Sequence, residues 1–132
     1  VIDCPPALGV LTANALVAAS RALLVTEPRV ESAQALAQAL QTIANVKAYY
    51  NPNLLPAGIL INRLRGGRRD QAQWVQQIRE IYRDLVLEVQ IPEREALARG
   101  ASDSIPVDRI PGTAEVAERL DSLACTLLKG QK

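Results

Sequence analysis

The sequence predicts an α/β fold: a doubly wound, mostly parallel sheet of about four strands with helices on both faces. Two observations lead to this prediction. Short apolar segments alternate along the chain with longer segments whose apolar residues recur every three or four positions. The short segments are apolar throughout, which is typical of parallel strands that are buried on both faces. Strands that alternate with helices form βαβ units, and these build one open parallel sheet.

The length and composition limit the classes of protein to consider. A chain of 132 residues, of which 48% are hydrophobic, supports a single domain over residues 1–132. It contains one Trp, three Tyr and no Phe, so we expect an aliphatic core. The net charge of +1 favours neither nucleic acid nor a membrane as partner.

Cysteine and histidine usage excludes two kinds of site. The chain has no His, and Cys4 and Cys125 lie far apart in sequence. A zinc site and a His-dependent triad are therefore excluded, and we expect two buried free thiols in a reducing cytoplasm. There is no 18-residue apolar span, and we expect a cytoplasmic protein. Because the first residue is not Met and an apolar strand pattern is already under way, we expect a fragment.

The elements follow from periodicity and from turn residues. We expect strands at 1–3, 22–26, 57–62 and 86–91. We expect helices at 8–19, 28–49, 70–84 and 113–128, with a short helical piece near Ala96. Asp70 and Thr113 are the expected N-caps of the last two long helices.

The first candidate site is Asp3, which ends the first apolar segment. Pro5 and Pro6 follow it and cannot continue the hydrogen bonds of a strand, so the chain must leave the sheet there. Open α/β sheets bind ligands at the carboxyl ends of their strands, where a carboxylate can hold Mg²⁺ directly or through water. The alternative is that Asp3 only begins a turn.

The segment that starts at Asp3 also carries a family resemblance. Asp-Cys-Pro-Pro-Ala-Leu-Gly at 3–9, with Thr-X-Asn-Ala-Leu at 12–16, resembles the Walker B segment of the ParA family of partition ATPases. Proteins similar to MinD usually carry Asp-X-Pro-Ala-Gly instead. Two further segments, 58–63 and 90–92 with the loop to 106, extend the resemblance over nearly the whole chain. Only the C-terminal half or so of such a protein is covered.

The resemblance implies roles for three strand ends. Asp3 would be the catalytic residue that orients Mg²⁺ and its water. Asn62, with neighbouring Arg63, would read the adenine edge, and Pro92 would form another wall of the base pocket. The residues alone leave simpler alternatives open. Asn62 is equally compatible with a strand end that bonds its own turn, and Pro92 with a plain strand terminator.

A basic cluster follows the third expected strand. It comprises Arg65, Arg68 and Arg69, and is continued along the next helix by Arg79 and Arg83. The resemblance implies that these arginines bind DNA without sequence preference, through its phosphates. The alternative is a solvated surface whose acidic partners are Asp70, Glu80 and Asp84.

Two features depart from the family pattern. After the Ile-Pro at 91–92, relatives usually carry Arg-Asn and another basic residue, but this chain has Glu93-Arg94-Glu95, and its acids would repel phosphate. The Walker A signature Lys-Gly-Gly-X-Gly-Lys-Thr does not occur in the 132 residues. In the family, the strand before Walker A lies between the Walker B strand and the next one. We therefore expect an incomplete sheet, a poorly held segment at 1–6, and neither ATP binding nor hydrolysis by this chain alone.

The function implied by the resemblance is chromosome or plasmid partitioning. The complete protein would bind ATP and Mg²⁺, form a sandwich homodimer, bind DNA at the nucleoid, and respond to a ParB-like partner. One alternative is a catalytically inactive interaction module. Another is a MinD-like positioning ATPase at the membrane, which is disfavoured because Glu115, Glu118 and Asp121 make the last helix acidic.

Overall fold

The computed structural model describes residues 1–5 and 7–129, without the side chain of Ala101; Pro6, the second proline of the expected turn, lies outside the described residues. The strands are β1 (Arg21–Thr26), β2 (Leu55–Leu64) and β3 (Val86–Pro92). The α-helices are α1 (Val10–Ala18), α2 (Ser32–Tyr49), α3 (Arg69–Tyr82), α4 (Glu95–Ser102) and α5 (Ala114–Lys129). Two short 3₁₀ turns, η1 (Arg83–Leu85) and η2 (Val107–Arg109), precede β3 and α5.

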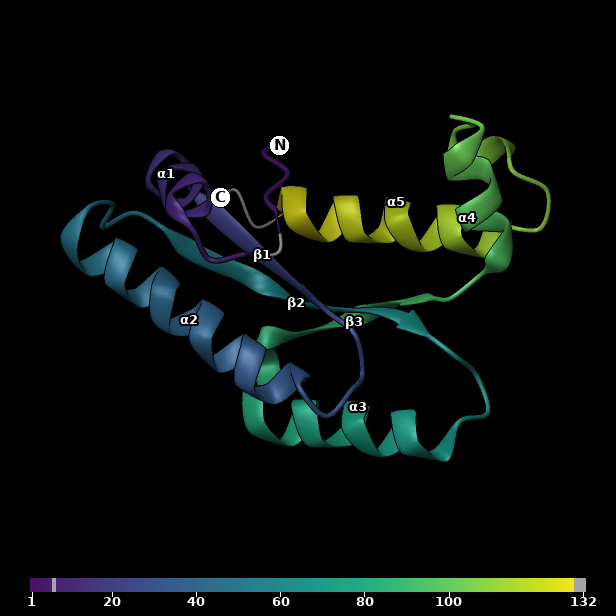
Figure 1. Ribbon diagram of the computed structural model, residues 1–132, viewed down its shortest axis with the longest axis horizontal. Coiled ribbons are helices and arrows are strands. Elements are labelled where there is room, and N and C mark those ends of the chain that lie inside the picture. Colours follow the sequence, from purple (N-terminus) through teal and green to yellow (C-terminus); the bar gives the residue numbers. More distant parts are fainter. Residues whose placement is uncertain (6, 130–132) are drawn as a thin grey trace.

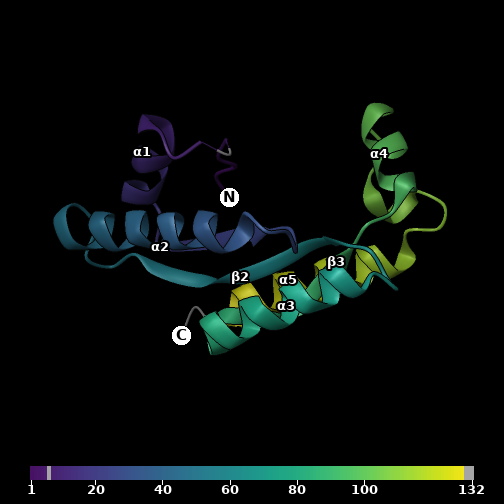
Figure 2. The ribbon, with the colours of Figure 1, turned by 60° about the horizontal axis from the view of Figure 1, so that its bottom comes forward.

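The three strands form one parallel sheet in the order β1-β2-β3, so β2 is central. Figure 1 shows α2 and α3 below this sheet and α5 above it. In Figure 2, α1 and α4 stand at opposite ends of the molecule, and α4 follows directly from the carboxyl end of β3. The predicted α/β architecture, a parallel sheet covered on both faces, is confirmed.

Each face of the sheet has its own aliphatic core. On one face, Ile59 and Ile61 of β2 pack among buried residues of α2 and of α3, such as Leu36 and Ile78. On the other face, Leu60 packs with residues of α5, including Val116. Successive residues of β2 thus point to opposite faces and are buried on both, which explains why this strand is apolar without alternation.

The expected strand at 1–3 is not formed. Residues 1–5 have no regular secondary structure, and both Val1 and Ile2 are exposed. They line a groove of about 1160 Å³ that runs along α1, α2 and the open edge of β1. A strand needs a hydrogen-bonding neighbour, and within the described residues β1 pairs only with β2. This agrees with the expectation of an incomplete sheet.

The ends of several elements differ from the predictions. The N-cap of α3 is Arg68, and Asp70 lies in the first turn, where its charge favours the helix dipole. Thr113 occupies the predicted N-cap position of α5, and its backbone carbonyl accepts from the N–H of Ala117 at 3.0 Å. Its hydroxyl does not cap the helix, because its one hydrogen is shared between the carbonyls of Val107 at 2.6 Å and Ile110 at 2.7 Å. It therefore holds the preceding turn closed. Both thiols, expected to be buried, are exposed.

The α1 helix is positioned by one side chain from a distant turn. The amide nitrogen of Asn51 donates to the carbonyls of Val17 at 3.1 Å and Ala19 at 2.7 Å. These carbonyls at the end of α1 lack partners within the helix, so Asn51 satisfies them and ties α1 to the turn before β2. No helix among the described residues is both long and apolar enough to cross a membrane.

Candidate nucleotide and nucleic-acid site

Polar side chains gather at the carboxyl ends of the three strands. Glu27 follows β1 directly, Asn62 and Arg63 lie near the end of β2, and Glu93 follows β3 directly. Because the strands are parallel, these residues meet at one edge of the sheet, where open α/β folds bind ligands.

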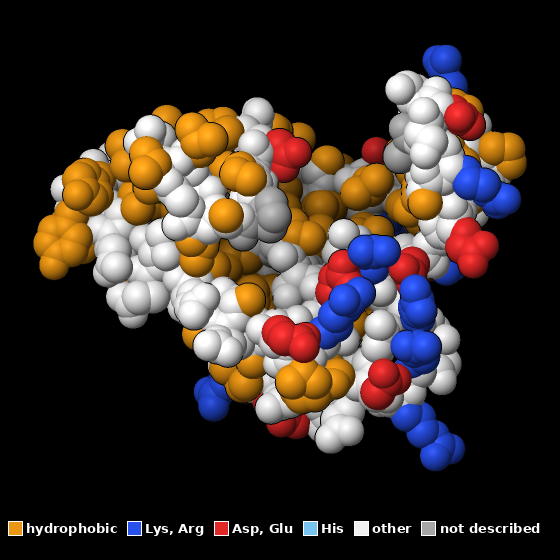
Figure 3. Space-filling model, in the orientation of Figure 1, with side chains coloured by type: hydrophobic (Ala, Val, Ile, Leu, Met, Phe, Trp, Pro, Cys, Tyr) orange, Lys and Arg blue, Asp and Glu red, His pale blue; other side chains and the backbone are white. Residues whose placement is uncertain are grey.

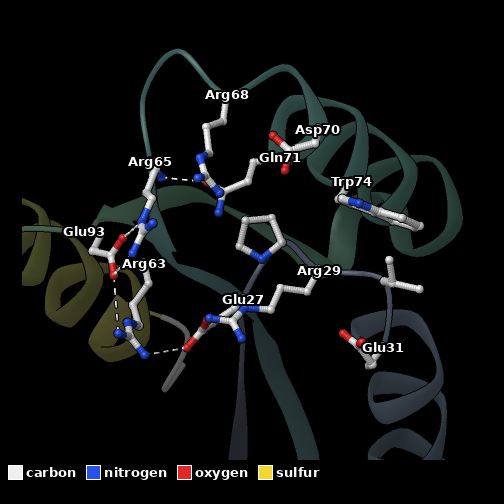
Figure 4. A pocket seen from close by; sticks show the side chains of 12 residues that line it. Glu27, Arg29, Glu31, Arg63, Arg65, Arg68, Asp70, Gln71, Trp74 and Glu93 are labelled. Carbon is white, nitrogen blue, oxygen red and sulfur yellow. Dashed lines mark hydrogen bonds and ion pairs between the residues drawn. The ribbon is translucent and has the colours of Figure 1, made fainter.

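A pocket of about 300 Å³ opens at this edge (Figure 4). Its walls come from the strand ends and from the beginnings of α2 and α3. It is lined by Glu27, Pro28, Arg29, Val30, Glu31, Arg63, Arg65, Arg68, Asp70, Gln71, Trp74 and Glu93.

Five of the lining residues form a continuous chain of ion pairs, which we call the strand-end ion-pair chain: Arg29, Glu27, Arg63, Glu93 and Arg65. Arg63 is its centre and donates to Glu27 at 3.0 Å and to Glu93 at 3.3 Å. At the outer ends, Arg29 pairs with Glu27 at 2.6 Å, and Arg65 donates to Glu93 through both Nε and Nη2. The strand-end ion-pair chain therefore links the ends of all three strands (Figure 4).

Asn62, Arg63 and Pro92, the residues expected to contact adenine, lie near the carboxyl ends of β2 and β3, and of the three only Arg63 lines the pocket. Leu64 of β2 is paired with Pro92 of β3, and the backbone N–H of Glu93 donates to the Leu64 carbonyl at 2.9 Å. Asn62 is half-buried, and its side-chain oxygen accepts from the backbone N–H of Arg63 at 2.9 Å. This bond supports Arg63 in a left-handed conformation, with φ of 55°.

The Asn62 bond is the one expected if Asn62 serves its own turn. It leaves the two amide N–H donors of Asn62 without partners in the described part of the chain. Those donors fit an acceptor atom of a base, so the two interpretations of Asn62 are compatible.

Asp3 does not reach the strand-end pocket. It is exposed in the N-terminal segment and lines the groove beside the open edge of β1. Across residues 1–5 and 7–129, no three Asp, Glu, Cys or His side chains are grouped as metal ligands. A lone carboxylate fits Mg²⁺ only as a partial ligand, with waters and nucleotide phosphates completing the octahedron.

The five arginines predicted to bind DNA divide into two groups. Arg65 and Arg68 line the pocket and Arg69 begins α3, whereas Arg79 and Arg83 lie at the far end of that helix. Arg69 and Arg79 are separated by ten positions of α3, which is about 15 Å along the helix axis. Figure 3 shows blue and red side chains interspersed over this part of the surface.

The arginines also differ in their partners. Arg65 is paired with Glu93, and Arg79 donates to the Leu87 carbonyl at 3.3 Å. Arg68 and Arg69 are exposed and form no ion pair with any described residue. The helical periodicity that placed Arg79 and Arg83 on one face ends early, because α3 stops at Tyr82 and Arg83 has φ of 44°.

Sequence reasoning missed Glu27 and Arg29 as site residues. The rule that selected Asp3, an acid immediately after an apolar strand, applies equally to Glu27-Pro28 after β1. Trp74 was not assigned to the site either, and only its spacing of four from Asp70, one turn along α3, could have placed it beside the pocket.

The fold is similar to that of P-loop NTPases. The structure superimposes on cobyrinic acid a,c-diamide synthase from Mycobacterium smegmatis, solved with a bound ATP analogue and magnesium, with a TM-score of 0.74. That match covers 98% of this chain and 49% of the synthase, at 28% sequence identity. The same synthase solved with ADP and magnesium gives a TM-score of 0.63 over 77% of this chain and 47% of the synthase, again at 28% identity.

The sequence comparisons then point to a family. A family model described as an AAA domain matches residues 1–55. The sporulation initiation inhibitor protein Soj of Bacillus subtilis is 30% identical over 81% of this chain and 42% of its own length. The chromosome partitioning protein ParA of Myxococcus xanthus is 35% identical over 81% of this chain and 38% of its own length. The chain is therefore similar over most of its length to partition ATPases of the ParA family, and it spans about two fifths of the length of these curated relatives.

Proposed function

We propose that this chain is the C-terminal portion of a ParA-type ATPase that acts in chromosome or plasmid partitioning in the cytoplasm. The observation that carries this proposal is the similarity to Soj and ParA proteins together with the polar strand ends at one sheet edge. The complete protein would bind ATP and Mg²⁺, form an ATP-dependent homodimer, and respond to a ParB-like partner.

The residues of this chain would divide the work at the nucleotide. Asn62 donates to the base through its unused amide hydrogens, and the backbone at Pro92 walls the base on the neighbouring strand. Arg63 holds the two strand ends in place through Glu27 and Glu93. Asp3 would help to hold Mg²⁺ through a water, and the metal would supply positive charge to the phosphoryl group.

The nucleic-acid surface would centre on Arg68 and Arg69, with Arg65, Arg79 and Arg83 around it. Exposed guanidinium groups without carboxylate partners are available to phosphate and need no internal bond to break. Such contacts fix no base sequence, and they give a strong dependence on salt. They fit a nucleoid-associated protein that binds DNA without sequence preference.

The proposed DNA binding is tested by charge reversal in the longer protein that contains this chain. Arg68→Glu with Arg69→Glu should weaken binding to duplex DNA of any sequence at least about tenfold, and should flatten the salt dependence. Affinity for ATP should not change, since neither Arg68 nor Arg69 is among the residues proposed to hold the nucleotide. Fluorescence anisotropy over a salt series measures both quantities.

A matched control is Glu118→Gln, an exposed position of α5 on the opposite face of the sheet. If the double arginine variant binds DNA like the parent protein at low salt, Arg68 and Arg69 are not the DNA surface.

A further inference from the structure

We propose that Glu93, assisted by Glu27, restrains nucleic-acid binding by holding Arg63 and Arg65 in ion pairs at the strand ends. This inference rests on the proposed DNA binding and gives a role to Glu93, whose acidic side chain departs from the pattern of the family that the sequence resembles. In that pattern a basic residue follows Ile-Pro, and here the position is a carboxylate that contacts two arginines.

The geometry makes Glu93 the central acceptor of the surface. One of its oxygens accepts from Arg63 at 3.3 Å and from Arg65 Nη2 at 3.1 Å, and the other accepts from Arg65 Nε. Its side chain is 20% exposed, against 55% for Arg63 and 52% for Arg65. The carboxylate therefore lies deeper than the arginines, and their outer surfaces face solvent.

Phosphate and carboxylate compete for the same guanidinium atoms. The two-pronged contact of Arg65 with Glu93 uses the Nε and Nη2 donors along one edge of the guanidinium, the same donors that would otherwise bind a phosphate. To bind DNA, Arg65 must give up those bonds, and the released carboxylate would then lie close to a phosphate of the same sign. Glu27 acts in the same way on the other side of Arg63.

The charge balance supports the same conclusion. The strand-end ion-pair chain contains three arginines and two glutamates, so its net charge is only +1. Arg68, exposed on the rim of the same pocket, pairs with no described residue and would carry the first phosphate contact. If the charge of Glu93 were removed, Arg65 and Arg63 would also become available to contact phosphate, with no new basic residue added.

An experiment on the longer protein follows from this competition. Glu93→Gln keeps the shape of the side chain, removes its charge and replaces one acceptor oxygen with an NH2 donor, so the side chain can no longer hold both arginines. Binding to duplex DNA of random sequence at about 0.1 M salt should become at least about threefold tighter, and the slope of log K against log salt should steepen by about 0.9 for each arginine released. Glu27→Gln frees Arg29 and one side of Arg63, and should also tighten binding, but it leaves Arg65 paired with Glu93.

Two further variants separate this mechanism from a general change in charge. Glu118→Gln removes one negative charge from α5 at an exposed position that pairs with no described arginine, and it should leave affinity and slope unchanged. Adding Arg65→Gln to Glu93→Gln should remove most of the gain.

The outcomes also separate this inference from the proposal on which it rests. Parent protein that binds DNA, with Glu93→Gln binding no more tightly, overturns the role of Glu93 alone. Absence of binding at low salt by both proteins overturns the DNA-binding proposal and this inference together. A gain in Glu118→Gln equal to that in Glu93→Gln also overturns the role of Glu93, because net charge alone would then explain the result.

Discussion

Single residues at the carboxyl edge serve both the fold and the proposed chemistry. Arg63 has a left-handed backbone, which costs a non-glycine residue about 1 kcal/mol or more. Two local features offset this cost: the hydrogen bond to Asn62 and the ion pairs to Glu27 and Glu93. The backbone at Arg63 is thus held in one conformation, as the proposed contact of Asn62 with a base requires.

Asp3 presents the opposite case, a candidate catalytic residue that the structure leaves exposed and outside any strand. In the longer protein we expect Asp3→Ala to lower Mg²⁺-dependent ATP turnover at least about 100-fold, because the water on the metal would lose its acceptor. An exposed side chain contributes little to stability, so the unfolding midpoint should change little.

Steady-state phosphate release measures this effect, with thermal unfolding as the check on the fold. Asp103→Ala is a suitable control, because Asp103 is an exposed acid just after α4 and lines neither the pocket nor the groove. Turnover by Asp3→Ala at the parental rate would reduce Asp3 to a turn residue.

Among the helices and strands, β2 is the one whose residues are most restricted by their neighbours. It pairs on both sides, packs on both faces, and accommodates an irregularity where Leu23 of β1 pairs with Gly58 and not with Ala57. Gly58 has φ of 141°, and a Cβ at this position would lie 2.5 Å from Leu87 Cδ2. Both the backbone angle and the close approach of β3 require glycine here.

Gly58→Ala should therefore destabilise the protein by about 1–3 kcal/mol. Chemical denaturation measures the change. Gly66→Ala is the matched control, because nothing lies within 4 Å of a Cβ there, and it should change stability by less than about 0.5 kcal/mol. Adding Leu87→Ala to Gly58→Ala removes the clash and leaves the backbone strain, so it should not restore parental stability. An unchanged denaturation midpoint for Gly58→Ala would contradict the requirement for glycine.

Apolar periodicity and proline positions were sufficient to predict most of the helices and strands. The long helices α2, α3 and α5 and the strands β1, β2 and β3 lie where apolar periodicity and proline placed them, because local pattern and tertiary burial agree there. Helix ends were predicted less well. The cap of α3 is Arg68, since the side chain of Asp70 is already inside the first turn.

The ion pairs of the loop after β3 join residues that are distant in sequence, so no local sequence pattern predicts them. Arg94, which was read only as part of a departure from the family pattern, pairs with Glu115 of α5. The hydrogen bond from Arg94, followed by that from Arg119, lowers the pKa of the Glu115 carboxyl below its usual value. Ion pairs between residues distant in sequence, including the strand-end ion-pair chain, depend on strand order and could not be read from spacing.

At the scale of the whole molecule, one side of the sheet remains open. Apolar side chains of α1, including Val10 and Leu11, are exposed, and Figure 3 shows a hydrophobic surface over α1 and the end of α2. The groove of about 1160 Å³ lies between α1, α2 and the edge of β1. The predicted strand at 1–3 is not formed for the same reason. An apolar segment becomes a strand only where a neighbouring strand offers backbone hydrogen bonds, and that depends on the whole sheet and not on local sequence.

The open side leads to the last prediction, which concerns ATP. The 132-residue chain should show no micromolar binding of Mg·ATP, because a triphosphate needs a cradle of backbone N–H groups at a helix N-terminus and a lysine. No Lys-Gly-Gly-X-Gly-Lys-Thr segment occurs in the chain, and the strand-end pocket has as many carboxylates as arginines. Four arginines and four acids in one small pocket provide no net attraction for a polyanion.

Isothermal titration calorimetry of this chain with Mg·ATP measures the affinity, and the longer protein serves as the positive control. A second titration with adenosine separates the base from the phosphates. If Asn62 and Pro92 form a base wall, adenosine and ATP should bind this chain with equally weak, millimolar-range affinity, since the phosphates would add nothing. Micromolar binding of Mg·ATP by the 132 residues would contradict the prediction and would place a phosphate site within the strand-end pocket.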